Sequence, residues 1–296
     1  MSGRTNDAGL PNFLVIGAMK AGTTSLFHYL QAHPQVYLSP LKEVDFFAVG
    51  ANWWRGVEWY RKQFQKAPAN AIAVGEASTI YTRYPEHPGV AERIASLLPE
   101  ARLIYVLRDP IERIRSHYQH RVLIGAERSP IEVAVRENPS YVDCSRYALQ
   151  LQQYLPYFSR NQILLVTSED LRGDRANTMV TIFGFLDVRS DFVPHVLDQE
   201  FYRTEQREAY PSYVWAIRRL AKHHIPASKR AKEFVDAVLP RTIGRLKTSE
   251  RPRGAERASE MVTDELRSEL VDRLRDDVRS LRTYLPDNDF TGWGIA

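Results

Sequence analysis

A single lysine lies in a run of small residues that joins two apolar segments near the start of the chain. The run is Gly17–Ser25, with Lys20 near its centre; it follows Phe13–Ile16 and precedes Leu26–Leu30, where apolar residues recur at helical spacing. A strand, a small-residue loop and a helix N-terminus together present unpaired N–H groups and the positive end of a helix dipole to an anion. We therefore predict that this loop binds a phosphate, the alternative being a plain turn.

The loop differs from the Walker A pattern of ordinary nucleotide-binding loops. That pattern is G-x-x-x-x-G-K-[ST], in which the lysine follows the second glycine and a hydroxyl holds Mg²⁺. Here Gly22 is followed by Thr23, and the lysine stands earlier, at position 20. Lys20 would therefore reach the anion from the loop rather than from the helix.

A second cluster of chemically competent residues lies at positions 108–116, with the sequence R-D-P-I-E-R-I-R-S. Arg108 ends the apolar run 102–107, and Ser116 lies nearly two turns into the helix that follows. The Arg108 guanidinium and the Ser116 hydroxyl would bind a second phosphate from two sides. Alternatively, Arg108 pairs with Asp109 and Ser116 is an ordinary helix residue. Two anion sites on one sheet edge predict a nucleotide with phosphates at two places.

Short apolar runs alternate with amphipathic segments along the chain. The runs predict strands at 13–16, 36–38, 71–76, 102–107 and 162–167, and the other segments predict helices at 89–98, 110–123, 145–158, 174–186, 213–224, 229–239 and 262–285. Buried strands separated by helices are typical of an α/β fold, here a P-loop-type three-layer sandwich with a mainly parallel central sheet. Ligands of such folds bind at the carboxyl ends of strands, which places the first loop, Glu76–Ser78, Arg108 and Glu169 at one edge.

Length and composition limit the domain organisation and the compartment. The sequence has no internal repeat, linker or clear boundary, so residues 1–296 are expected to form one domain, with 1–11 as a flexible N-terminus. Cys144 is the only cysteine, which rules out a disulfide within the chain and a cysteine-rich zinc site. The polar start and the lack of a long apolar run predict a cytoplasmic protein without signal peptide or membrane anchor. The oligomeric state stays open.

Positive charge is concentrated between residues 215 and 257. The net charge of the chain is +4, whereas this segment carries twelve Lys/Arg and four Asp/Glu, a local charge of +8. Such a patch suits an anionic ligand, although a solvated surface explains it equally well. Nucleic acid is not expected as a partner, because no recognition motif accompanies the charge.

The loop at 17–25, the K-E-V-D-F-F stretch at 42–47 and the R-D-P-x-x-R-x-x-S pattern at 108–116 follow one another in a specific order. Together they resemble the PAPS-dependent sulfotransferases, and within them the heparan sulfate N- and 3-O-sulfotransferase branch and its soluble bacterial relatives. Glu169-Asp170-Leu171 and the segment 178–186 are also similar to that family. The resemblance covers roughly residues 12–190 and, more loosely, the terminal helix with Asp289, Phe290 and Trp293.

The resemblance implies a role for each matching residue. The loop would wrap the 5′-phosphosulfate of PAPS through Lys20, Ala21, Gly22, Thr23, Thr24 and Ser25. Arg108 and Ser116 would bind the 3′-phosphate, Lys20 would neutralise the leaving oxygen, and Glu43 would be the catalytic base. The acceptor would be a hydroxyl or amine of a small molecule or glycan, and the nucleotide product PAP. Because a sulfuryl group carries less charge than a phosphoryl group, no metal is expected.

Two positions depart from the heparan-type pattern. Asp45 stands where those enzymes carry histidine, which leaves open whether Asp45 shares or takes over the role of base from Glu43. Ala77 stands where their E-K-T-P segment has lysine, which implies a different handling of the acceptor. Other sulfotransferase branches use a histidine base, for which His117 and His120 are the candidates.

Acceptor binding is expected at the aromatic segment 53–60 and at 127–145. The candidate contacts are Lys42, Phe46, Phe47, Trp53, Trp54, Glu76 and Ser78, although core packing explains the tryptophans equally well. Lys247, Arg251 and Arg253 are candidates for a basic loop that closes over the 3′-phosphate. Two other functions stay open: a P-loop kinase that uses ATP and Mg²⁺, and a non-enzymatic binder of anionic polysaccharide.

Overall fold

The computed structural model of the chain describes residues 9–199, 201, 261–285 and 290–295. The chain divides into two compact units, of which the first comprises 1–114, 138–203 and 263–296 and the second comprises 115–137 and 204–262. The predicted helices at 213–224 and 229–239, the basic segment 215–257 and its residues Lys247, Arg251 and Arg253 lie outside the described residues. The expectation of one domain over residues 1–296 stays a prediction.

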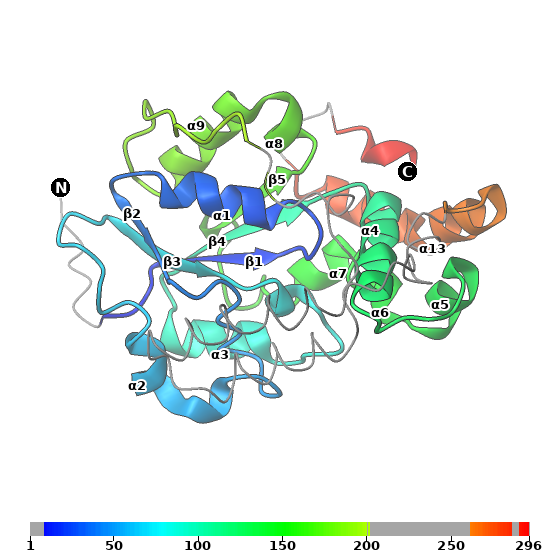
Figure 1. The fold of residues 1–296 in the computed structure, drawn as a ribbon, viewed down its shortest axis with the longest axis horizontal. Coiled ribbons are helices and arrows are strands. Elements are labelled where there is room, and N and C mark those ends of the chain that lie inside the picture. Colours follow the sequence, from blue (N-terminus) through cyan, green and yellow to red (C-terminus); the bar gives the residue numbers. More distant parts are fainter. Residues whose placement is uncertain (1–8, 200, 202–260, 286–289, 296) are drawn as a thin grey trace, which may run out of the picture. The chain divides into compact units, whose positions relative to one another are not determined.

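The first unit is built on a five-stranded parallel sheet in the order β2-β3-β1-β4-β5 (Figure 1). The strands are β1 (Phe13–Gly17), β2 (Val36–Leu38), β3 (Ala73–Ala77), β4 (Arg102–Leu107) and β5 (Ile163–Thr167). Phe13 of β1 pairs with Gly75 on one side and with Arg102 on the other. Every residue of β1 and β3 is buried, as expected of strands covered on both faces. The predicted α/β fold is confirmed, with small shifts at the ends of β3 and β5.

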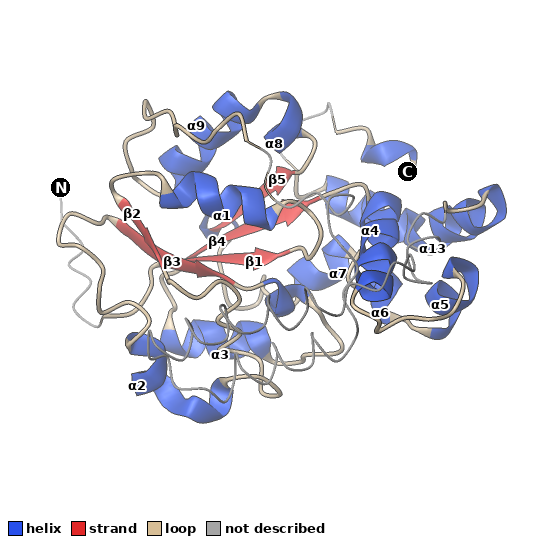
Figure 2. Ribbon diagram, viewed as in Figure 1, coloured by secondary structure: helices blue, strands red, loops and turns tan. Residues whose placement is uncertain are grey.

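Helices cover both faces of this sheet, with α1 and α9 on one face and α2 and α3 on the other (Figure 2). The helices of the first unit are α1 (Thr23–Gln31), α2 (Gly56–Arg61), α3 (Val90–Leu97), the start of α4 (Pro110–Leu123), α6 (Ser140–Asp143), α7 (Tyr147–Gln152), α8 (Asp170–Gly173), α9 (Arg175–Phe185) and α13 (Asp264–Arg282). The two-sided cover follows from chain direction. β1 leads through α1 toward one edge, whereas β3 leads through α3 toward the other, and right-handed crossovers in opposite directions place their helices on opposite faces.

The predicted helix at 145–158 is wrong in length, because α7 ends at Gln152. Pro156 explains the early end: it lacks a backbone N–H, and it disfavours helical geometry at the preceding residue. The chain after α7 continues as turns, in which the N–H of Gln153 donates to the carbonyl of Gln150 at 3.1 Å. The side chain of Tyr154 then anchors this segment by donating its hydroxyl to the carbonyl of Tyr81 at 2.7 Å.

The C-terminal helix α13 confirms the apolar pattern seen in the sequence. Thr263 caps its N-terminus by accepting a hydrogen bond from the N–H of Leu266. Its buried residues are Leu266, Leu270, Leu274, Val278 and Leu281, spaced in steps of four and three. Asp277 on the same helix accepts hydrogen bonds from the N–H groups of Ala148 and Leu149, at 3.0 and 2.9 Å. This carboxylate therefore caps the first turn of α7 from a helix that is distant in sequence.

The described part of the second unit contains the rest of α4, from Arg115 to Leu123, and α5 (Ile131–Glu137). Tyr118 is buried and donates its hydroxyl to the carbonyl of Ser129 at 3.0 Å. The Arg121 guanidinium donates to the carbonyl of Ala126 at 3.1 Å, which closes the turn after α4.

The cap that Asp277 provides should be a measurable part of the stability of the protein. Replacement of Asp277 by alanine leaves two N–H groups of α7 without their acceptor, so we expect the free energy of unfolding to fall by about 2 kcal/mol. Asp276→Ala is the matched control, because the Asp276 side chain is 95% exposed and its ion pair with Arg279 should contribute little. Urea denaturation of the three proteins measures both effects, and equal stability of the two variants would contradict the cap.

Candidate functional site

The loop after β1 has the backbone geometry of an anion site. Lys20 and Gly22 both have positive φ, 74° and 95°. Gly22 sits at the N-cap of α1, and no side chain caps the first turn of this helix, which leaves its N–H groups to another acceptor. Close packing makes glycine necessary at position 17: a Cβ there would lie 1.9 Å from Oγ1 of Thr82, whose hydroxyl donates to the carbonyl of Ile16 at 3.2 Å. The phosphate role predicted for residues 20–25 has a suitable frame but stays a prediction.

The side chain of Ser25 is already engaged within the protein. Its hydroxyl donates to the carbonyl of Phe201 at 3.3 Å and accepts from the N–H of the same residue at 3.2 Å. The Phe201 ring lies 4.2 Å from the ring of His28 on the same helix. Donation from the Ser25 hydroxyl to a phosphate would therefore require the bond to Phe201 to break. The backbone N–H of Ser25 could bind a phosphate without breaking that bond.

Arg108 follows β4 and contacts the loop after β1. Its Nη1 donates to the carbonyl of Lys20 at 3.1 Å, and its Nη2 lies 3.6 Å from a carboxylate oxygen of Glu112. Burial lowers the pKa of the Arg108 guanidinium, and the charge of Arg172 adds to the effect. The carbonyl of Arg108 accepts a hydrogen bond from the hydroxyl of Tyr147 at 2.7 Å. The structure thus brings together Arg108 and the Lys20 loop, the two anion-binding elements predicted for this unit.

Arg172, on α8, is a residue that the sequence did not single out. Its Nη2 donates to Oγ of Ser168 at 3.1 Å, and that oxygen lies 3.7 Å from the position that a Cβ on Gly22 would take. The Arg172 charge also acts on Arg108. The two guanidinium groups repel each other and lie beside a helix N-terminus. A bound anion would offset this repulsion. The sequence held one signal for Arg172: it stands two residues after the Glu169-Asp170 pair, close to the carboxyl end of β5.

Glu43 lies beside the end of β3 and is held at both carboxylate oxygens. Its Oε1 forms an ion pair with Nζ of Lys42 at 2.6 Å, and its Oε2 accepts from the N–H and the hydroxyl of Thr79 at 2.8 and 3.1 Å. The backbone N–H of Glu43 donates to the carbonyl of Ala77 at 2.9 Å. The Glu43 side chain is 28% exposed, so solvent or a ligand can still reach it. Thr79 was not predicted, because the contact joins residues 36 positions apart.

The other residues predicted as acceptor contacts next to Glu43 are buried in the protein. The side chains of Phe46, Phe47, Glu76 and Ser78 are fully covered. Glu76 accepts three hydrogen bonds, from the hydroxyls of Ser78, Tyr60 and Tyr81 at 2.5, 2.8 and 2.8 Å. Burial, with a contribution from the nearby charge of Asp45, raises the pKa of Glu76 to about 7. Their burial favours a supporting role for these four residues, and a direct contact with an acceptor stays a prediction.

Three of the residues predicted to do chemistry have strained backbones. Lys20, Glu43 and Asp45 have φ values of 74°, 60° and 56°, in the left-handed region that residues with a Cβ avoid. Each such residue costs roughly 1–2 kcal/mol, which the surrounding structure must offset. Among the other described residues that carry a Cβ, only Asp187 and Trp293 share this geometry. Strain of this kind clusters at functional sites, and here it coincides with the predicted catalytic set.

The aromatic segment divides into a partly buried and an exposed part. Trp53, on the short 3₁₀ helix η1 (Trp53–Arg55), packs against Phe46 at 5.2 Å between ring centroids. Trp54 is 72% exposed, and the Arg55 guanidinium lies between the rings of Trp54 and Trp59, at 4.8 and 4.9 Å. Core packing therefore accounts for Trp53 and not for Trp54.

Asn52 fixes this exposed group relative to the predicted base. Its side chain is buried; its amide nitrogen donates to the carbonyl of Val44 at 2.7 Å, and its amide oxygen accepts from Nε of Arg55 at 3.0 Å. Val44 stands between Glu43 and Asp45 in the chain, so one side chain ties Arg55 to the loop that carries both carboxylates.

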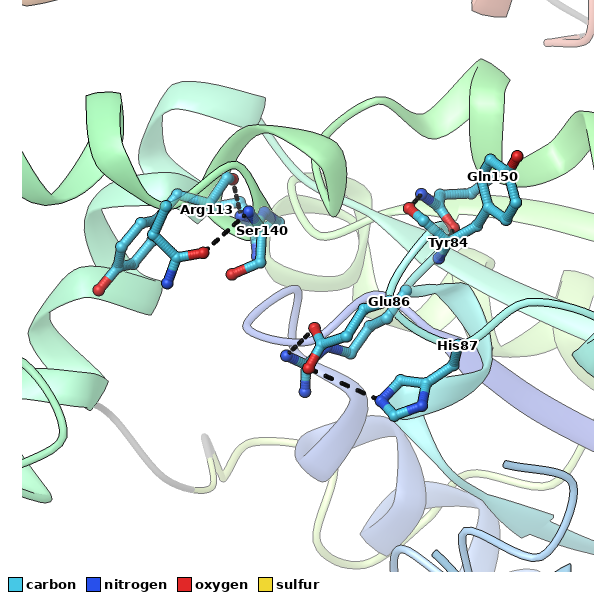
Figure 3. Close-up of polar contacts among 9 residues, drawn as sticks. Tyr84, Glu86, His87, Arg113, Ser140 and Gln150 are labelled. Carbon is cyan, nitrogen blue, oxygen red and sulfur yellow. Dashed lines mark hydrogen bonds and ion pairs between the residues drawn. The ribbon is translucent and has the colours of Figure 1, made fainter. Parts of the chain in front are cut away.

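Polar contacts of Arg113 and Gln150 fix the chain around the start of α4 and after β3 (Figure 3). Arg113 is fully buried and donates to Oγ of Ser145 and to the carbonyl of Tyr141. Gln150 pairs with the backbone of Tyr84, at 2.8 and 2.7 Å. A cavity of about 160 Å³ lies nearby, lined among others by Tyr84 and His87, and none of the predicted catalytic residues lines it.

Ser116, His117 and His120 lie on the part of α4 that belongs to the second unit. Ser116 and His117 are buried, with 6% and 2% exposure. The pairing of Ser116 with Arg108, and the alternative of a histidine base, stay predictions.

No group of three or more His, Cys, Asp or Glu side chains in the described residues is arranged to hold a metal ion. In the same part of the chain, no helix has the length and apolar character needed to cross a membrane. The expectations about metal, anchor and compartment stay predictions.

Comparison with known proteins places these features in a family context. The family model described as "Sulfotransferase domain" matches residues 10–234. The chain is similar to the bifunctional heparan sulfate N-deacetylase/N-sulfotransferase 4 of Mus musculus, with 34% identity over 201 residues, 60% of this chain and 22% of the mouse protein. It is also similar to the membrane-associated sulfotransferase kil1 of Dictyostelium discoideum, with 34% identity over 163 residues, 49% of this chain and 34% of that protein. The match therefore spans only a minor part of each relative.

A solved structure resembles the chain over nearly its whole length. The crystal structure of a sulfotransferase from Alicyclobacillus acidocaldarius has a TM-score of 0.67 and 25% sequence identity, covering 96% of this chain and 98% of that chain.

The close approach at Gly17 predicts a coupled pair of mutations. Gly17→Ala should lower the free energy of unfolding by about 1–3 kcal/mol, because the new methyl group overlaps the Thr82 hydroxyl. Thr82→Ala removes that hydroxyl, so the double variant should lose less than the sum of the two single losses. Gly184→Ala is the control, since a Cβ there meets no atom within 4 Å. Thermal or urea unfolding measures the cycle, and strictly additive losses would refute the predicted overlap.

Proposed function

The chain belongs to the sulfotransferase domain family, and from this premise we propose that it transfers the sulfuryl group of PAPS to a hydroxyl or amine of a small-molecule or glycan acceptor. The observation that carries the proposal is the bond from Arg108 Nη1 to the carbonyl of Lys20 at 3.1 Å. It joins a strand-end arginine to a phosphate-type loop, so the two predicted anion-binding elements lie next to each other. A nucleotide with phosphates at its 5′ and 3′ positions, as in PAPS, matches this pair.

In this proposal the loop binds the 5′ end of the nucleotide and Arg108 binds the 3′-phosphate. The uncapped N–H groups of α1 and the side chain of Lys20 face the phosphosulfate, and Arg172 adds positive charge nearby. Ser116 is the predicted second contact of the 3′-phosphate. The fit of an anion to this site is supported by the mutual repulsion of Arg108 and Arg172, which a bound anion would relieve.

The proposed chemistry is one in-line displacement at sulfur. The acceptor oxygen or nitrogen forms a bond to sulfur while the bond from sulfur to the phosphate oxygen breaks, and PAP leaves. Glu43 takes the proton from the acceptor, and Lys20 stabilises the charge that develops on the leaving oxygen. The three donors on Glu43, from Lys42 and Thr79, support this role because they hold the carboxylate in one orientation. Asp45 is the alternative base.

We propose that Trp54 and Arg55 contact the acceptor. An exposed indole beside a fixed guanidinium offers an apolar face and a positive charge, which suits a sugar ring that carries an acidic group. The link through Asn52 to the carbonyl of Val44 places this pair on the loop of the proposed base. The buried Phe46 and Phe47 and the partly buried Trp53 would support the same region through packing, and Lys42 would do so through its ion pair with Glu43.

Nucleotide binding tests the proposed function directly. Calorimetry in EDTA should show micromolar binding of PAP, weaker binding of adenosine 5′-monophosphate, and no binding of ATP. Arg108→Gln should weaken PAP binding about 10–100-fold, because it removes a charge-assisted contact, and should leave the monophosphate affinity unchanged. Arg279→Gln is the charge-matched control, since the Arg279 side chain is 66% exposed on α13.

The same titration separates the other two functions. ATP binding that requires Mg²⁺, without PAP binding in EDTA, would favour the kinase and overturn the proposal. Binding of a sulfated oligosaccharide without any nucleotide binding would favour the polysaccharide binder.

Substitution of the proposed base should separate turnover from nucleotide binding. Glu43→Gln should lower kcat by about 10²–10⁴-fold and leave the Kd for PAP within twofold, because a general base acts on the acceptor proton. Asp272→Asn on α13, whose side chain is 65% exposed, is the control and should keep full turnover. Turnover is measured with radiolabelled PAPS and a panel of amino sugars, uronic-acid oligosaccharides and simple alcohols. Full activity of Glu43→Gln with loss of activity in Asp45→Asn would assign the base to Asp45.

A further inference from the structure

We propose that Glu76 is a positioning residue, which fixes the backbone of residues 43–46 through two hydroxyl relays and thereby holds Glu43 in place. The inference rests on the proposed function, because it takes Glu43 as the base. Glu76 was expected to contact the acceptor, but its carboxylate is fully covered by protein. Its contacts point instead toward the loop that carries Glu43.

The first relay runs through Ser78. The N–H of Asp45 donates to Oγ of Ser78 at 2.9 Å, and the Ser78 hydroxyl donates to Oε2 of Glu76 at 2.5 Å. A hydroxyl has one proton to donate, and here it is used on the carboxylate. The oxygen of Ser78 is thereby left as an acceptor for the backbone of the loop.

The second relay runs through Tyr81 and has the same direction. The N–H of Phe46 donates to the Tyr81 hydroxyl oxygen at 3.0 Å, and that hydroxyl donates to Oε1 of Glu76 at 2.8 Å. The N–H of Phe47 donates to the same hydroxyl at 3.5 Å, so three consecutive N–H groups of the loop are bound by two hydroxyls that share one carboxylate. The ionised carboxylate accepts only, so it sets the direction of both relays.

Tyr60 provides the third hydrogen bond to Glu76 but no relay. Its hydroxyl donates to Oε1 of Glu76 at 2.8 Å, and its ring stacks on Phe46 with centroids 4.3 Å apart and planes 10° from parallel. Tyr60→Phe would keep the stacking and remove only the donor. This residue is therefore a natural control for the two relays.

The contacts of Glu43 itself come from the same short segment as the relays. The carbonyl of Ala77 accepts its backbone N–H, and Thr79 donates twice to its carboxylate. Residues 76–81 thus form a template, in the sense that their hydrogen bonds fix the backbone of residues 43–46. The template is needed because Glu43 and Asp45 have φ values of 60° and 56°, a geometry that an unsupported loop would leave.

Burial of a carboxylate without a cation costs free energy, so we infer that Glu76 has a role that offsets this cost. Among the described residues no lysine or arginine forms an ion pair with Glu76; its partners are three hydroxyls. The titratable groups that face it are Tyr60 from α2, Tyr81 from the 3₁₀ helix η2 (Thr79–Thr82), and Asp45 from the loop. With its pKa raised to about 7, Glu76 gains a proton as the pH falls through neutrality. Protonated Glu76 donates its own proton to one of its three hydroxyl partners, so it no longer imposes the direction of both relays.

Four variants test the relays in the full-length protein. Ser78→Ala and Tyr81→Phe each remove one relay, Glu76→Gln replaces the acceptor with a group that also donates, and Tyr60→Phe leaves both relays intact. We expect the first three to lower kcat about 10–100-fold, because a displaced base loses its geometry. Their KM for PAPS and Kd for PAP should stay within twofold, and Tyr60→Phe should stay within threefold of wild type in kcat. Circular dichroism and thermal unfolding confirm that each variant is folded.

Two further readouts separate positioning from general stability. Amide hydrogen exchange by NMR should be faster at Asp45 in Ser78→Ala. In Tyr81→Phe it should be faster at Phe46 and, less strongly, at Phe47, whose N–H lies farther from the Tyr81 hydroxyl, at 3.5 Å. The kcat of the wild type should rise with pH through about 7, and this step should vanish in Glu76→Gln. Such a pattern would not follow from a loss of stability, which would change exchange throughout the unit.

The outcomes distinguish the inference from the proposed function. Exchange at Asp45 and Phe46 that is unchanged in the relay variants, or changed exchange with unchanged kcat, would overturn the positioning role while PAP binding persists. Absence of PAP binding in the wild type would instead refute the proposed function and leave the exchange result standing as a structural fact. Loss of kcat in Tyr60→Phe equal to that in Tyr81→Phe would also overturn the relays.

Discussion

Two loops leave the parallel sheet on either side of the point where its strand order reverses, and one hydrogen bond joins them. β1 leads toward one edge and β4 toward the other, and ligands of such folds bind at the carboxyl ends of the strands at this point. Arg108 joins the two loops by donating to the carbonyl of Lys20. Tyr147 holds the Arg108 carbonyl in turn, and Asp277 caps the helix that begins at Tyr147. The arginine is thus fixed against the loop by contacts that extend to the C-terminal helix.

The same edge of the sheet contains most of the unfavourable features of the unit. Lys20, Glu43 and Asp45 have left-handed backbones, and Glu76 is a buried acid whose pKa is raised. The strained backbones and the buried acid both cost free energy, which the packed structure around them must offset. The compensation is visible as hydrogen bonds from the segment that follows β3, which is itself anchored by buried tyrosines such as Tyr81. The stable core therefore supports a strained edge, as expected where function rather than stability selects the geometry.

The sequence predicted the features that depend on local pattern. Buried strands, the small-residue loop around Lys20, the helix that begins at Pro110 and the periodic C-terminal helix each have a signature within a few residues. Contacts between distant segments had no such signature: Thr79 meets Glu43 across 36 positions, and Ser25 meets Phe201 across 176. The end of α7 was missed although Pro156 marks it, because the apolar spacing outweighed the proline in the prediction. The predicted roles of the site residues need a bound ligand to test them.

The geometry of the loop also bears on the choice between the two candidate bases. A base changes charge in each turnover, so the structure around it must tolerate both charge states. The Asp45 charge lies close enough to Glu76 to raise the pKa of that buried acid. The N–H of Asp45 also donates to Ser78, whose hydroxyl donates to Glu76. A proton on Asp45 would therefore alter the charge balance that keeps the loop in place. The carboxylate of Glu43 is bound by Lys42 and Thr79 instead and is partly exposed, so its contacts are separate from the two relays. This favours Glu43 as the base and Asp45 as a residue that tunes Glu76.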